Sequence, residues 1–174
     1  MNEQLKKYFA KWLGTFFLLP VIVYLILHSG DFLFIDYLNL LIHEGGHGVF
    51  KIFGRFIYTL GGTLMQIIIP SMFVVYYFVT RKKFLTQVFL IWLGENFFNI
   101  SVYASDARSK KLLLLGGSKV YHDWNYLLSK TGLLEYDLLI GKVFIALGLI
   151  SFLLVLFIPI IIKNEKPVNL DLNL

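Results

Sequence analysis

Residues 43 to 47 read His-Glu-Gly-Gly-His, and this H-E-x-x-H spacing carries the clearest chemistry in the sequence. Residues four apart in an α-helix lie on one face, so His43 and His47 can direct imidazole nitrogens at a single metal ion. Glu44 follows the first histidine, where its carboxylate can reach a metal-bound water without binding the metal itself. The pattern predicts a zinc site in which Glu44 is the general base.

The composition shows in what environment this motif lies. Of the 174 residues 57% are hydrophobic and only 16% are charged, whereas soluble domains carry about a quarter charged residues. This excludes an ordinary soluble globule and favours a lipid bilayer. The net charge of +5 indicates no nucleic-acid partner, because Lys and Arg cluster between apolar runs as in loops that flank membrane spans. The chain has no Cys, so a metal must be bound by His, Asp, Glu or backbone groups.

Five segments are long and apolar enough to cross a bilayer, which takes about 20 residues. We therefore predict an all-α fold: a polytopic, multi-pass integral membrane bundle that forms a single domain over residues 1–162. The predicted spans are 8–27, 32–53, 60–79, 84–104 and 143–162. Lys and Arg are more numerous on the side of the N-terminus, which predicts that the N-terminus is cytoplasmic.

The two longest segments outside these spans follow the fourth and the fifth span. Residues 105–137 form the longest polar stretch, and we predict a loop here with a short helix that has Asp123 as its N-cap. Residues 163–174 contain Pro167 and scattered Asn, which predicts a disordered tail.

The metal motif lies inside a predicted span, and this position favours function over packing. An acidic group at the centre of a bilayer costs about 2.5–3.5 kcal/mol, so polar clusters there usually have a function. Two histidines do not complete a catalytic zinc site, which takes three protein ligands and a water. The sequence leaves the third ligand open among Asp106, His122, Asp123 and Glu95.

The motif resembles that of the site-2-protease class of intramembrane zinc metalloproteases. The similarity includes Gly46 before the second histidine of residues 43–47. That family has its third ligand, an Asp, two membrane helices later, and this resemblance implies Asp106. Ala107 stands where the family has Gly, so His122 is the alternative, which would give a three-histidine site.

The resemblance implies an endopeptidase that uses zinc to hydrolyse peptide bonds of transmembrane protein substrates. Zinc would polarise the scissile carbonyl, while Glu44 takes a proton from water and returns it to the leaving amine. Asn96 and Asn99 would orient a ligand, donate to the developing oxyanion, or join helices by hydrogen bonds. The alternative function is a non-enzymatic metal-binding membrane protein, or an inactive protease homologue that acts as a membrane partner or sensor.

Small residues are concentrated next to the motif. We expect Gly45, Gly46 and Gly48 to let another backbone approach the metal helix closely, as small residues do in membrane proteins. The third span is weakly similar to the Gly-Pro-x-x-Asn helix of the same family, through Gly61, Gly62, Gln66 and Pro70.

Overall fold

The computed structural model describes residues 2–112 and 121–162, and it contains helices and turns but no strand within these residues. The helices are α1 (Glu3–Leu27), α2 (Phe34–Phe50), α3 (Gly54–Val79), α4 (Lys83–Ser105), α5 (Asp123–Thr131) and α6 (Asp137–Ile161), with short 3-10 helices η1 (Lys51–Phe53) and η3 (Leu134–Tyr136). The all-α prediction is confirmed. The predicted tail at 163–174, and residues 113–120 of the predicted loop, lie outside the described residues.

The helix bounds follow the predicted spans, but three helices begin five or six residues earlier than predicted. Helix α1 begins at Glu3, five residues before the predicted span, and helices α3 and α6 begin at Gly54 and Asp137, each six residues before it. Among the described residues, two helical stretches are long and apolar enough to cross a membrane: Phe34–Val79, which joins α2, η1 and α3, and Leu134–Ile161, which contains α6. Helix α1 is apolar over the shorter stretch Lys11–Leu27.

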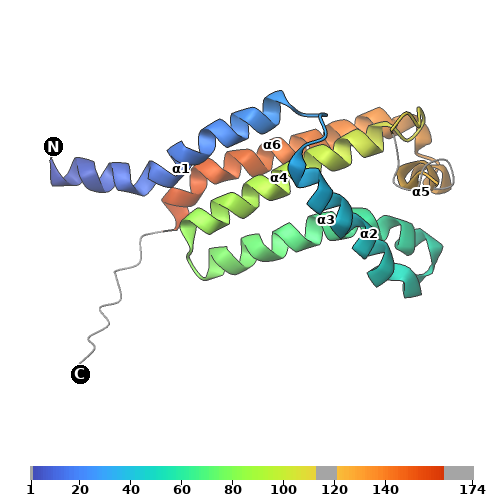
Figure 1. Cartoon of the computed structure of the whole chain (residues 1–174), viewed down its shortest axis with the longest axis horizontal. Helices are drawn as coiled ribbons and strands as arrows, with labels where there is room; N and C mark the ends of the chain where they lie inside the picture. The colour runs from blue at the N-terminus through green and yellow to red at the C-terminus, as the bar shows by residue number, and fades with distance from the viewer. Residues whose placement is uncertain (1, 113–120, 163–174) are drawn as a thin grey trace, which may run out of the picture.

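The antiparallel helices α4 and α6 form the centre of the bundle and lie side by side along its length (Figure 1). Their contact depends on two reciprocal pairs in which a phenylalanine ring of one helix covers a glycine of the other. Phe152 packs over Gly94 and Phe98 packs over Gly148, and the two rings meet edge to face at 5.3 Å. A β-carbon on either glycine would lie 2.5–2.6 Å from the opposing ring, so only glycine allows this close approach.

Helices α2 and α3 form a tight hairpin that positions the H-E-x-x-H motif. The chain reverses through η1 and then Gly54, whose φ of 83° is a conformation that L side chains rarely adopt. Gly46 of α2 then lies directly against the backbone of Gly61 in α3. Of the three glycines expected to admit another backbone, only Gly46 does so, because β-carbons on Gly45 and Gly48 would face open space.

Helix α5 lies at the end of the bundle where α4 ends and α6 begins (Figure 1). The predicted N-cap is wrong by one residue: His122 is the cap, and its Nδ1 accepts the backbone N–H of Asn125 at 3.2 Å. Asp123 is the first helical residue, so its carboxylate is available for other partners. This shift by one position is what directs Asp123 toward the histidines of α2.

Candidate metal centre

Both histidines of the motif face one carboxylate oxygen from a distant part of the chain. Nε2 of His43 lies 2.9 Å from Oδ2 of Asp123, and Nε2 of His47 lies 3.2 Å from the same oxygen. All three side chains are buried, and their ligand atoms lie within 4.8 Å of one another. Two imidazoles and a carboxylate suit Zn²⁺ and related divalent ions, so this group could hold a metal ion.

The second ring nitrogen of each histidine also has a partner. Nδ1 of His43 lies 2.8 Å from Oε1 of Gln66, and Nδ1 of His47 lies 2.8 Å from the backbone carbonyl of Tyr58. Both partners are oxygens that accept, so each histidine donates from Nδ1. This leaves Nε2 as the nitrogen that faces Asp123, which is the arrangement that supporting hydrogen bonds impose on metal-binding histidines.

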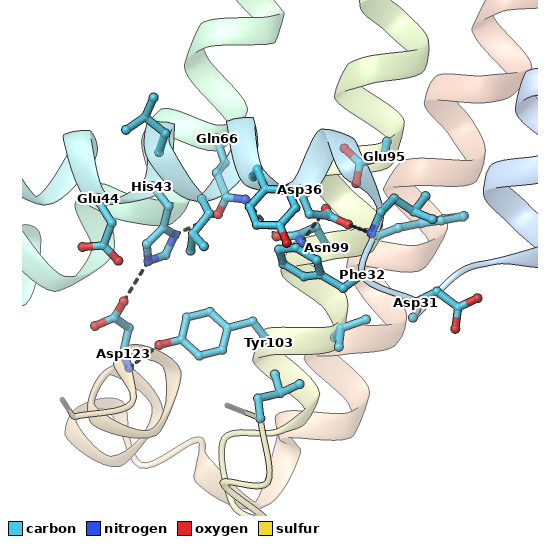
Figure 2. Close-up of a pocket in the computed structure, with 18 of the residues that line it drawn as sticks. Asp31, Phe32, Asp36, His43, Glu44, Gln66, Glu95, Asn99, Tyr103 and Asp123 are labelled. Atoms are coloured by element: carbon cyan, nitrogen blue, oxygen red, sulfur yellow. Dashed lines mark hydrogen bonds and ion pairs between the residues drawn. The ribbon is translucent and has the colours of Figure 1, made fainter. Parts of the chain in front are cut away.

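Asp123 is positioned by helix α5 and by a tyrosine of α4. Its backbone N–H donates to the hydroxyl of Tyr103 at 3.0 Å, and Figure 2 shows this phenol reaching from α4 toward Asp123. Burial of Asp123 opposes its negative charge, but the hydrogen bonds from His43 and His47 outweigh this effect and hold the pKa of its carboxyl below the usual range. The carboxylate is therefore anionic at neutral pH and could act as a metal ligand.

The metal group opens onto a cavity of about 670 Å³ between α2, α4 and the connection from α1 to α2. Glu44 is exposed and lines this cavity, and Figure 2 shows its carboxylate beside His43 on the side that faces Asp123. Tyr103 and Tyr121 line the same cavity. A group that enters the cavity can therefore meet the histidines, Asp123 and Glu44 together.

Asp106 and His122, the two predicted third ligands, lie apart from the metal group. The Asp106 carboxylate accepts the hydroxyl of Ser109 and the backbone N–H groups of Lys111 and Leu112, each backbone bond being 2.9 Å long. Nε2 of His122 lies 3.4 Å from Asp106 Oδ2. In the described part of the chain, the structure brings Asp123 alone of the four candidates together with both histidines. Asp106 is the C-cap residue of α4, and its carboxylate is occupied by hydrogen-bond donors from the turn that follows this helix.

The polar residues of α4 lie behind the metal group. Glu95, the fourth candidate ligand, accepts a hydrogen bond of 2.6 Å from Asn39. Asn99 donates to Asp36 at 2.8 Å, and Asn96 donates to the carbonyl of its own helix at Trp92. The oxygens of both Asn96 and Asn99 accept from Gln66. Both asparagines thus contact the partner of a histidine.

Comparisons with known proteins supply no relative for this arrangement. No family model matches the chain. The searches of curated proteins and of solved structures find no match either. The function must therefore be argued from the geometry of the site and from the resemblance of its motif.

Sequence reasoning missed Tyr103 as a partner of Asp123 and Tyr58 as a partner of His47. A signal for the first existed, because Glu95, Asn99 and Tyr103 follow one another at intervals of four residues and so lie on one face of α4. No side-chain signal existed for Tyr58, because its contribution is a backbone carbonyl.

Proposed function

We propose that this protein is an intramembrane zinc endopeptidase of the site-2-protease class, with His43, His47 and Asp123 as zinc ligands and Glu44 as general base. The observation that carries the proposal is the convergence of both Nε2 atoms of the H-E-x-x-H motif on one oxygen of Asp123, beside a cavity that Glu44 also lines. Three protein ligands are the number found in catalytic zinc sites, whereas structural sites have four. The donor set therefore favours catalysis over a structural role.

Bound zinc would lower the pKa of a water molecule toward 7 and polarise the carbonyl to be cleaved. The side chains of this protein perform the remaining tasks. Asp123 and the two histidines offer three ligand atoms whose directions are already fixed by hydrogen bonds. Glu44 is not engaged in this group, so its carboxylate is free to take a proton from water and to return it to the leaving amine.

The surface of the helices supports a membrane location for α1, α2, α3, α4 and α6. Large apolar side chains are exposed on several helices; Phe17, Leu41 and Val79, for example, are each about 70% exposed. Polar side chains such as Gln87 and Asn96 are buried instead. This reversed polarity suits lipid, because exposed apolar surface of this extent is rare on soluble monomers. The substrate would then be a transmembrane segment of another protein.

The test separates metal binding from catalysis by replacing Glu44. We expect Glu44→Gln to retain the zinc content of wild type and to lose cleavage of transmembrane peptides by about 10²- to 10⁴-fold, because the general base is gone. Purified protein in detergent would be assayed for zinc and, by mass spectrometry, for products from a set of such peptides. Glu135→Gln, at an exposed position in η3, is the matched control. Undiminished cleavage by Glu44→Gln would refute the mechanism, and bound zinc without cleavage by wild type would favour the non-enzymatic alternative.

A further inference from the structure

Helix α1 runs parallel to helix α4. Gln87 of α4 donates to the hydroxyl of Thr15 in α1 at 2.7 Å, and further along both helices Leu25 and Phe98 belong to one core cluster. Residue numbers therefore rise in the same direction along the two helices. Figure 1 shows α1 ending part-way along α4, from where the chain continues into α2.

Helix α2 also runs in the direction of α4. Helices α2 and α3 are the two arms of a hairpin and so are antiparallel. Helix α3 is in turn antiparallel to α4: Gln66 bonds Asn99 at 2.9 Å, whereas Phe73, further along α3, stacks on Phe89, which comes earlier in α4. The chain thus passes from α1 into α2 without reversing its direction.

The connection between α1 and α2, residues 28–33, lies inside the length of the bundle. Measured from the contact of α1 with Gln87, His28 reaches the level of Ile100. Helix α4 continues from that level to Ser105, about 8 Å further at a rise of about 1.5 Å per residue. Its 23 residues are about 34 Å long, which suits one crossing of a hydrocarbon core of about 30 Å. The connection therefore lies within the bilayer rather than outside it.

This connection has a defined structure and faces the cavity of the candidate site. Gly30 has a φ of 104°, a conformation that L side chains rarely adopt. Leu33, in an extended conformation before α2, donates its N–H to Oδ2 of Asp36 at 2.6 Å. Residues 29–32 are exposed and line the cavity that reaches the metal group. Non-helical backbone at membrane depth is tolerated where it lines a water-filled cavity, and this position meets that condition.

The two ends of the bundle differ in what they hold. At one end, Nζ of Lys83, next to the turn between α3 and α4, donates to the carbonyl of Lys11 at 3.1 Å, so this turn and the N-terminal part of α1 lie together. At the other end, the hydroxyl of Tyr103, close to the last residue of α4, accepts the N–H of Asp123 at 3.0 Å. The candidate metal group therefore lies at the end opposite to the N-terminal part of α1.

We propose that α1 and α2 are two parts of one membrane crossing, interrupted at residues 28–33 where the cavity admits water, and that the candidate metal group lies near the membrane face opposite to the N-terminus. The inference rests on the proposed membrane location, but not on metal binding or catalysis. Five alternating crossings, by contrast, would bring the N-terminus and the end of α4 to the same face. A transmembrane substrate would be cut near the face opposite to the N-terminus.

The chain contains no Cys, so single cysteines can report which face each position reaches. The variants are Lys11→Cys in α1, Lys82→Cys in the turn between α3 and α4, and Lys130→Cys in α5. Each is treated with a membrane-impermeant maleimide in sealed membrane vesicles of expressing cells, before and after the vesicles are opened. We expect Lys11→Cys and Lys82→Cys to react from one face and Lys130→Cys from the other. Reaction of Lys11→Cys and Lys82→Cys from opposite faces would overturn the proposal.

Two neighbouring positions test the interruption itself. Ser29 and Leu27 are both exposed, but Ser29 lines the cavity whereas Leu27 is not among its lining residues. We expect Ser29→Cys to react from the same face as Lys130→Cys, because water reaches it through the cavity. The matched control Leu27→Cys should react only after denaturation, because its thiol faces lipid. Equal reaction of both in sealed vesicles would place the connection outside the bilayer, and no reaction of Ser29→Cys would exclude water from the cavity; either result would contradict the proposal.

The same vesicles separate this inference from the proposed function. Protein that an alkaline carbonate wash removes is not embedded, and the membrane location would then be wrong. If embedded protein is labelled as expected but binds no zinc, the inference stands and the proposed function fails. If wild type cleaves peptides while Lys11→Cys and Lys82→Cys react from opposite faces, only the inference fails.

Discussion

Gly62 of α3 gives the sharpest test of where His43 lies. A β-carbon at this position would be 2.5 Å from Nε2 of His43, whereas ordinary van der Waals contact begins at 3.4 Å. The ring must therefore move by about 0.9 Å, the difference between these two distances. Metal–ligand distances tolerate deviations of only about 0.2 Å, so Gly62→Ala should displace His43 from any ion held with His47 and Asp123.

The expected loss can be given as a range. Removing a hydrogen bond that supports a ligand weakens metal affinity by about 10- to 100-fold, and displacing the ligand itself should cost more than that. We expect Gly62→Ala to bind zinc at least about 100-fold more weakly than wild type. The overpacked α2–α3 contact should also lower the free energy of unfolding by about 1–3 kcal/mol.

The control is the same substitution at Gly48, directly after His47. A β-carbon there meets nothing within 4 Å, so Gly48→Ala should bind zinc like wild type and gain up to about 1 kcal/mol of stability from helix propensity. Zinc affinity would be measured by chelator competition, and folding by thermal unfolding in detergent. Tight zinc binding by folded Gly62→Ala would show that His43 is not a ligand in this position, and the geometry of the site would be refuted.

Two further predictions concern the aspartates that compete for the role of third ligand. Asp123→Asn should lose bound zinc after gel filtration, whereas Asp106→Asn should keep it, because only Asp123 lies with both histidines; the opposite result would move the site to Asp106. For Asp106, burial raises the pKa of its carboxyl, but the hydrogen bonds from Ser109 and the backbone N–H groups that follow outweigh burial and lower it. A carboxyl group whose pKa is lowered by folding stabilises the fold at pH values above its pKa in the unfolded chain, which is near 3.9. This stabilisation is lost as the pH falls through the pKa of the folded state. The melting temperature of wild type should therefore be higher than that of Asp106→Asn at neutral pH, and the difference between the two should shrink below about pH 4. A difference in melting temperature that does not change with pH would contradict this.

The helices were predictable because hydrophobic runs and their polar breaks are local features of the sequence. The positions where α3 and α6 begin were not. The first residues of these helices, Gly54 and Asp137, lie in segments that also contain the charged residues Arg55 and Lys142. An apolar run does not indicate that a helix continues beyond it into such polar residues. These early turns are held by tertiary contacts instead, such as the ion pair of 2.7 Å between Arg108 and Asp137.

The two histidines of the candidate metal group could be inferred from their spacing, but the aspartate that joins them could not. Asp106 and Asp123 are both aspartates that follow the fourth predicted span, and sequence spacing does not distinguish them. The difference is one of local donors: the turn after α4 surrounds the Asp106 carboxylate with N–H groups, while His122 takes the capping position and frees Asp123. Such competition between local partners depends on backbone geometry, so it is visible only in three dimensions.

The separation of 80 positions between His43 and Asp123 has a consequence for how the protein is made. At about 5–20 residues per second, a ribosome needs several seconds to pass from the first ligand to the last. During this interval the H-E-x-x-H helix has only two of the three proposed ligands, so it would hold an ion weakly. At the proposed site, firm capture of a metal would therefore wait until α5 has been synthesised and has docked, which would tie the acquisition of the ion to the late steps of assembly.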